Sequence, residues 1–266
     1  MLEIFQFEFM QRAFIAGTLI AILSPAIGSF LVIRRYSLMA DTLAHVSLAG
    51  IAISSFIGTP PIITALITSV IASIGIDRLR STKKYFGESL LALFLSGSLA
   101  LAIVLIGLSN GSSTFVVNYL FGSITTVTTL DIVTILCFSV VVICLLILYF
   151  NKLFFIAFDE ELAQANGINV QVLNILLVTL GAITVSLSMR IVGVLLIGAL
   201  MVIPFLTAVQ FKKGFKTSLF LSILFSLFSV LTGLFASYYL GVASGGTIVL
   251  ITLILFIISI VWNKKS

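Results

Sequence analysis

The sequence predicts an all-α protein, a polytopic transmembrane bundle of eight or nine spans in a single domain, residues 1–266. Hydrophobic residues make up 61% of the chain and charged residues only 9%, whereas soluble domains carry about 25% charge. The mean hydropathy is +1.32. A helix needs about 20 apolar residues to cross the hydrocarbon, where every backbone polar group must be bonded internally. These observations exclude a water-soluble domain and make membrane lipid an expected partner.

Stretches without Asp, Glu, Lys or Arg define the predicted helices in chain order. When these stretches are divided by the length of one span, they predict nine spans. Eight spans are nearly as compatible with the sequence, because the second span is short. The spans are predicted at 13–33, twice within 36–76, from Glu88, from Asp131, at 170–189, at 191–211 and twice within 217–263. Turn-forming residues predict loops at 58–61, 110–113 and 244–246.

The basic residues predict the orientation, because Lys and Arg gather in the cytoplasmic loops of membrane proteins. Nine spans that start outside place all but two of the 14 basic residues on the inner side, the exceptions being Arg12 and Arg190. We therefore expect the N-terminus outside and the C-terminus inside.

Several function classes are disfavoured by the composition. The net charge of +5 lies in small clusters between spans, so no nucleic-acid partner is expected. The sequence has no G-x-x-x-x-G-K-[ST] or H-E-x-x-H motif and a single histidine, so we expect neither an enzyme nor a permanently bound cofactor. Cys137 and Cys144 have a spacing that suits neither a zinc ribbon nor a short disulfide hairpin, and they are expected to pack in the core.

Asp41 and His45 are the residues that most strongly indicate a function. They stand four apart, so a helix places both on one face. An imidazole nitrogen with a carboxylate oxygen suits zinc, manganese or ferrous iron, and two ligands hold a metal weakly enough to release it. A two-fold dimer would bring two such pairs together. In the structural alternative, Asp41 caps a helix or pairs with Arg34 or Arg35.

The segment 158–168 is the second candidate. Three acidic residues, Glu160 and Glu161 among them, open it, Ala163 follows at helical spacing, and Gly167 closes it. Acidic residues at the start and a glycine at the end favour a short helix. Because the topology places it in the cytoplasm, we interpret it as a docking surface for a partner, the alternative being a solvated connector.

The remaining candidates are assigned structural roles. Asp131 follows a threonine-rich loop and is interpreted as a helix N-cap. Gly193, Gly198 and Ala199 are interpreted as small residues for close helix packing. The segment 119–123 is interpreted as a re-entrant or surface helix on the outer side.

Five ordered motifs carry a resemblance to a known family. They are FMQRA at 9–13 with Ala16-Gly17, RRYSLMADTLAHVSLAG at 34–50, YLFGSI at 119–124, the segment 160–167, and VGVLLIGALMVIP at 192–204. Together they resemble the zinc/manganese permease family of ATP-binding-cassette importers over essentially the whole chain. The family signature, an Arg-Arg pair leading to Gly-Asp-Ala-Leu-Ser-His, is similar to the second motif, and its Asp and His fall on Asp41 and His45.

The resemblance implies a complete transporter in the bacterial cell membrane. Two permease copies, two ATPase subunits inside and an extracytoplasmic metal-binding protein are expected. Asp41 and His45 would be the metal ligands, and the segment 160–167 would be the coupling helix that docks the ATPase. The sequence of residues 119–124 is most similar to that of zinc-uptake permeases of Gram-positive bacteria. Zinc is therefore the expected cargo, with manganese or iron as alternatives.

Departures from the family pattern and rival functions are also visible in the sequence. Ala40 and Ala44 replace the Gly and Ser that often flank the Asp-His pair, and Gly241 and Ala243 replace an Asp and a Pro, which removes a possible acidic ligand. A gradient-driven metal carrier is one rival, although such carriers usually have several acids or histidines within their spans. A membrane-embedded enzyme is disfavoured by the lack of clustered reactive residues.

Overall fold

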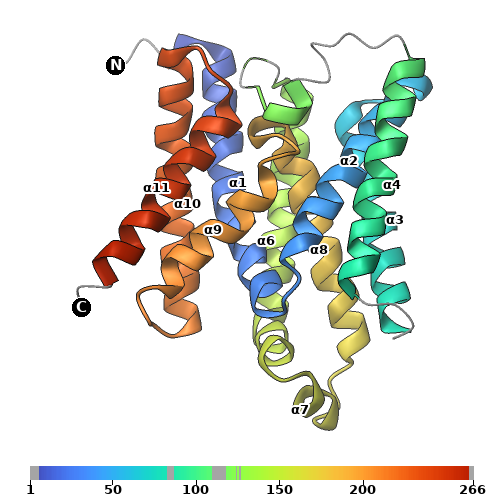
Figure 1. Cartoon of the computed structure of the whole chain (residues 1–266), viewed down its shortest axis with the longest axis vertical. Helices are drawn as coiled ribbons and strands as arrows, with labels where there is room; N and C mark the ends of the chain where they lie inside the picture. The colour runs from blue at the N-terminus through green and yellow to red at the C-terminus, as the bar shows by residue number, and fades with distance from the viewer. Residues whose placement is uncertain (1–5, 83–86, 110–117, 124, 126, 264–266) are drawn as a thin grey trace.

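The computed structural model describes residues 6–82, 87–109, 118–123, 125 and 127–263, and this part of the chain is all-helical, as predicted (Figure 1). Eight of its helices are long and apolar enough to span a membrane. The helices are α1 (Glu8–Ile33), α2 (Ser37–Ile57), α3 (Pro61–Ser81), α4 (Gly87–Leu108), α6 (Thr129–Phe158), α7 (Glu160–Ala165), α8 (Val170–Val192), α9 (Ile197–Val209), α10 (Phe215–Leu240) and α11 (Ser244–Asn263).

The helix predicted at 191–211 is shorter in the structure. α9 has 13 residues and is therefore about 20 Å long, less than the hydrocarbon thickness of about 30 Å. Gly193 ends α8 with a φ of 86°, and residues 194–196 form turns before α9 begins. α9 nevertheless runs from the end of α8 toward the opposite end of the bundle, so the start of α1 and the end of α11 lie toward opposite ends (Figure 1).

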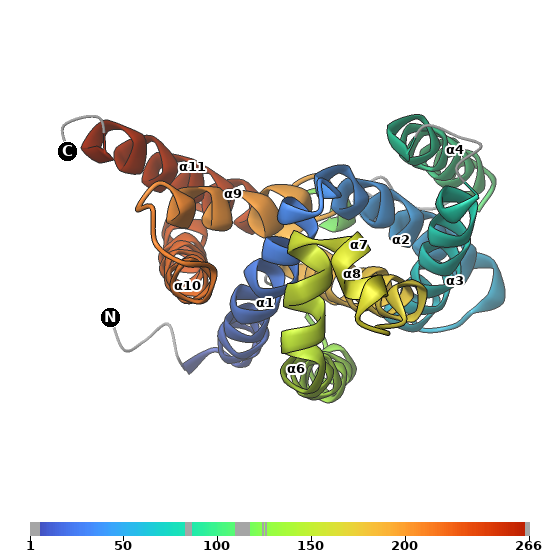
Figure 2. The same cartoon turned by 90° about the horizontal axis from the view of Figure 1, so that it is seen from below.

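The centre of the bundle is formed by α1, α2 and α8, the spans with the largest buried share. Viewed along the bundle, α9, α10 and α11 lie on one side of this centre and α3 and α4 on the other (Figure 2). α4 and α6 are the spans most exposed on their outer faces, which suits contact with lipid.

Two details of the sequence-based prediction are wrong. Residues 244–246 form the first turn of α11 rather than a loop. The chain turns three residues before α11 begins, at Gly241, which has a φ of 66°. Cys137 and Cys144 are exposed on α6 instead of packed in the core, because this outer helix turns most of its apolar residues outward. The loop predicted at 58–61 is confirmed at 58–60, whereas Pro61 already begins α3, and the loop predicted at 110–113 lies outside the described residues.

Small and hydroxyl residues hold α2 tightly against its neighbours. The Oγ of Ser47 lies 2.6 Å from that of Ser69 on α3 and 3.0 Å from that of Ser186 on α8, and all three side chains are buried. A Cβ at Gly50 would lie 2.9 Å from the Cα of Ala65, so only glycine permits this approach of α2 to α3. Small residues and interhelical hydroxyl contacts are the usual means of packing membrane helices, and here they fix the helix that carries Asp41 and His45.

Candidate functional site

Asp41 and His45 lie one turn apart on α2, as predicted, and both side chains are half-buried. The Nδ1 of His45 is buried and has no hydrogen-bond partner among the described residues. Buried polar atoms are normally satisfied, so an orphaned imidazole nitrogen is unusual. In the tautomer protonated at Nε2, this nitrogen is an electron-pair donor available to a cation.

The structural alternative for Asp41 is not observed. The N-cap of α2 is Tyr36, without a side-chain capping bond, and Arg34 pairs with Glu160. Within the described part of the chain, Asp41 has no ion-pair partner.

The Asp41 carboxylate instead lies directly against Gly198 in the first turn of α9. A Cβ at Gly198 would sit 2.7 Å from the Cγ and 3.2 Å from the Oδ2 of Asp41. Gly198 is therefore a close-packing residue, as predicted, but what it accommodates is the candidate ligand itself. The start of a helix also carries a partial positive charge, which favours a carboxylate there. Sequence reasoning missed this contact because 157 residues separate the two positions.

One chain supplies few metal ligands. The described residues contain no group of three or more His, Cys, Asp and Glu side chains that could hold a metal ion. The pair is therefore a two-ligand set, which suits transient binding better than permanent retention.

The start of α9 is held by backbone contacts at the predicted outer end. A short helical turn at 118–121 occupies the segment interpreted as a re-entrant or surface helix. The backbone N–H groups of Val194 and Leu195 donate to the carbonyls of Tyr119 and Leu120, at 3.0 and 3.2 Å. These bonds fix the 194–196 turn that leads into the Asp41–Gly198 contact.

Asp131 has a different role from the one predicted. Thr128 is the N-cap of α6, and Asp131 stands three residues later as its capping-box partner, accepting from the Thr128 backbone N–H at 2.9 Å. The same oxygen of this buried carboxylate, Oδ2, lies 3.3 Å from Arg190 Nε and forms an ion pair with it. Burial raises the pKa of Tyr119, whose ring lies under Arg190, to about 12, so its phenol stays neutral and the charges in this cluster are those of Asp131 and Arg190.

The segment predicted to dock a partner is confirmed as a short capped helix. α7 projects from the end of the bundle where α8 begins (Figure 1). The Asp159 side chain accepts from the Leu162 backbone N–H at 2.8 Å, and Gly167 ends the segment with a φ of 77°. Glu161 and Leu162 are exposed.

Two of the predicted docking residues are engaged within the chain. Ala163 is fully buried, because one side of α7 packs on α6 and α8, so it has no surface to offer a partner. Glu160 forms an ion pair with Arg34. Leu162, which sequence reasoning did not single out, is 50% exposed and is a large apolar residue that α7 presents outward.

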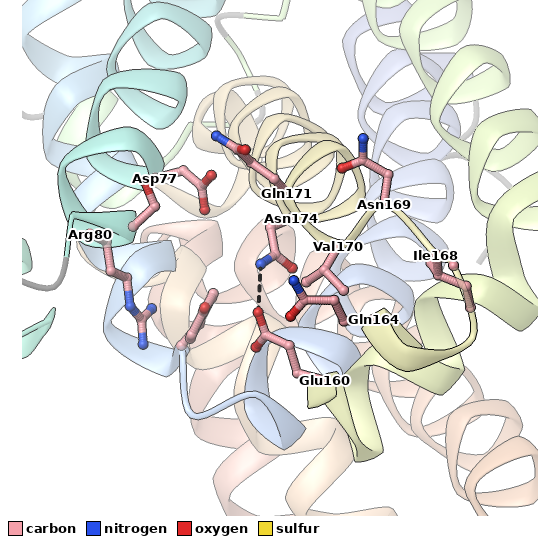
Figure 3. A pocket seen from close by; sticks show the side chains of 12 residues that line it. Asp77, Arg80, Glu160, Gln164, Ile168, Asn169, Val170, Gln171 and Asn174 are labelled. Atoms are coloured by element: carbon pink, nitrogen blue, oxygen red, sulfur yellow. Dashed lines mark hydrogen bonds between the residues drawn. The ribbon is translucent and has the colours of Figure 1, made fainter. Parts of the chain in front are cut away.

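A cavity of about 820 Å³ opens beside α7 (Figure 3). Its wall combines the ends of α3 and α8 with α7 and includes Asp77, Arg80, Glu160 and Asn174. The cavity is polar and lies at the end of the bundle, so α7 is supported by charged side chains on this side rather than by a packed apolar core.

Comparison with known proteins identifies the family. The model of the ABC 3 transport family matches residues 6–263. The chain belongs to this family. The resemblance inferred from the five motifs is thereby confirmed, together with a multi-pass location in the bacterial cytoplasmic membrane.

Related proteins share the whole length of the chain. It is 37% identical to a probable metal transport system membrane protein of Treponema pallidum, with 96% of each chain covered. It is 30% identical to the high-affinity zinc uptake system membrane protein ZnuB of Haemophilus influenzae, covering 97% of this chain and 99% of that protein. It is also 30% identical to the manganese transport system membrane protein MntC of Listeria monocytogenes, covering 98% and 93%.

A solved structure has the same fold. A chain of PsaBC from Streptococcus pneumoniae, determined in complex with Fab, matches with a TM-score of 0.87 and 32% identity, covering 97% of this chain and 92% of that one. The described helices are therefore arranged as in that chain.

Proposed function

We propose that this chain is the permease subunit of an ATP-binding-cassette importer of a divalent transition metal, with zinc as the first candidate for the transported metal. In this proposal Asp41 and His45 are ligands along the metal path. The observation that carries the proposal is the His45 Nδ1 one turn from the Asp41 carboxylate, where, in the part of the chain that the structure describes, the nitrogen has no hydrogen-bond partner and the carboxylate has no ion-pair partner. The names of the relatives, which refer to zinc and manganese, support the class of cargo.

The choice of zinc rests on the donor atoms. Imidazole and carboxylate suit zinc, whereas manganese favours sets richer in oxygen. Gly241 and Ala243 provide no side-chain oxygen where an acidic residue would enlarge the set. Manganese is the second candidate, because relatives named for either metal are equally similar to this chain.

The partners follow from the same proposal. A two-ligand set on one chain is completed by a second copy, so the permease is proposed to act as a homodimer. α7 is proposed to dock a separate ATPase subunit, with Glu161 and Leu162 facing it, and the opposite end receives an external metal-binding protein. Arg34, Arg80, Lys152 and Lys213 lie toward the α7 end, which supports a cytoplasmic location for that end.

Metal uptake tests the proposal. Cells that lack the gene are complemented with wild type, Asp41→Asn or His45→Ala, and radioactive zinc uptake is measured with unlabelled zinc or manganese as competitor. We expect both variants to abolish uptake at unchanged protein level. His45→Asp, which leaves only oxygen donors, is expected to shift the preference toward manganese.

Two results would contradict the proposal. Wild-type uptake in Asp41→Asn and His45→Ala at equal protein levels would remove the pair from the metal path. Uptake that survives ATP depletion but stops when the proton gradient is dissipated would favour a gradient-driven carrier.

A further inference from the structure

The turn between α1 and α2 joins the candidate metal ligands to the end of the bundle that carries α7. Arg34 follows the last residue of α1, α2 begins at Ser37, and Asp41 is only seven residues beyond Arg34. The turn is held by its own backbone, with the Tyr36 N–H donating to the Leu31 carbonyl at 2.7 Å. A force on the Arg34 side chain is therefore applied close to the first turn of α2.

The Arg34 guanidinium connects this turn with α7. It donates through Nη2 to Glu160 Oε2 at 2.6 Å and through Nη1 to Asn174 Oδ1 on α8. Asn174 Nδ2 in turn donates to Glu160 Oε1 at 3.3 Å, which closes a triangle of three side chains (Figure 3 shows its Glu160–Asn174 side). The Arg34 side chain is only 4% exposed, whereas that of Glu160 is 49% exposed. A guanidinium so buried depends on its partners, because a buried charge without a counter-ion is costly.

The triangle stands at the edge of the cavity rather than inside a packed core. Tyr36 lies under two guanidinium groups, 3.6 Å from that of Arg80 and 5.2 Å from that of Arg34. Asp77, which is 7% exposed, lies on the same wall (Figure 3). Because the neighbouring space is open, α7 and the turn can move together without disrupting the apolar bundle.

We propose that Arg34 is a positioning residue that transmits the movement of α7 to α2 and hence to Asp41 and His45. The inference rests on the proposed function and adds its coupling route. When the ATPase moves α7, the Glu160 carboxylate pulls the Arg34 guanidinium, and the short 34–36 turn passes the displacement to α2. Asp41 then moves relative to Gly198, which alters access to the metal pair.

Purified permease–ATPase complexes in proteoliposomes test this route. The variants are Arg34→Gln and Glu160→Gln, with Arg35→Gln as the matched control, since Arg35 is adjacent and exposed. Three quantities are measured: ATPase co-purification, basal ATP hydrolysis and zinc transported per ATP. We expect Arg34→Gln and Glu160→Gln to keep the first two and to lower the third about tenfold, within the usual range of coupling between sites. Arg35→Gln should match wild type.

Charge reversal separates coupling from simple structural support. In the double variant Arg34→Glu with Glu160→Arg, we expect more zinc per ATP than in Arg34→Glu alone, because the ion pair is re-formed. Glu160→Gln addresses the case in which Arg34 variants fail to fold, because a glutamine amide oxygen can still accept from Arg34, which also keeps its hydrogen bond to Asn174 Oδ1. Wild-type zinc per ATP in Glu160→Gln, or loss of ATPase binding in it, would overturn the inference. Inactivity of wild type itself would instead refute the proposed function.

Discussion

At the scale of single residues, Gly198 decides how closely α9 approaches Asp41. A methyl group at this position would overlap the Asp41 carboxylate. The residues next to Asp41 on α2 are buried and have little room to move. The site thus depends on a residue that has no chemistry of its own. Arg190 has a structural role elsewhere in the bundle, where it balances the charge of the buried Asp131.

Gly198→Ala is expected to lower zinc uptake about 10- to 100-fold at equal protein level, the usual effect of disturbing residues around metal ligands. The matched control is Gly97→Ala on α4, where a Cβ meets nothing within 4 Å. Both variants are compared by radioactive zinc uptake per molecule of permease. Equal uptake in the two would show that the Asp41–Gly198 contact is not needed for transport.

Asp131→Asn is expected to destabilise the fold by about 3 kcal/mol, because it leaves Arg190 largely buried without its counter-ion. The melting temperature of the detergent-solubilised protein measures the effect. Glu8→Gln serves as the control, because it breaks the exposed Arg12–Glu8 pair, whose loss should change the stability little. A melting temperature for Asp131→Asn as high as that of Glu8→Gln would contradict the assignment.

At the scale of elements, α7 combines an exposed side for a partner with a buried side against its own chain. Leu162 belongs to the first and Ala163 to the second. A helix of six residues has little stability alone, so its caps and its contacts with α6 and α8 hold it in place. Substitutions on its two sides should therefore have different consequences.

Leu162→Glu is expected to reduce co-purification of the ATPase while leaving permease abundance unchanged, since it charges an exposed apolar position. Ala163→Glu should lower abundance as well, because it buries a charge inside the chain. Leu162→Met is the conservative control. Co-purification at the wild-type level in Leu162→Glu would place the docking surface elsewhere.

At the scale of the whole molecule, the described basic side chains gather at the α7 end, with Arg12 and Arg190 as exceptions. Arg190 is neutralised by Asp131 and Arg12 pairs with Glu8, so neither acts as an unpaired charge at the other end. The distribution supports an orientation with α7 in the cytoplasm.

Thiol labelling in sealed cells tests this orientation. After replacement of Cys137 and Cys144 by alanine, a cysteine at Val242 should react with a membrane-impermeant reagent from outside, and one at Thr82 should not. Both positions are exposed and lie at opposite ends of the bundle. Gly245 is unsuitable, because a Cβ there would collide with the Val192 carbonyl. Labelling at Thr82 would reverse the topology.

The sequence by itself determined the features that depend on local pattern. Hydropathy located the spans, the four-residue spacing placed Asp41 and His45 on one helix face, and acidic and glycine residues marked the two ends of α7. Each of these follows from helix periodicity, span length or end chemistry, which act over a few residues.

Only the tertiary structure decided which distant residues meet. It paired Asp41 with Gly198, Arg34 with Glu160 and Asp131 with Arg190, turned Cys137 and Cys144 outward, and shortened α9. In a membrane span nearly every residue is apolar, so hydropathy does not distinguish a face that contacts lipid from one that contacts another helix. That difference arises from the shapes of small residues and the pairing of buried charges across the bundle, which depend on how the helices are arranged in space.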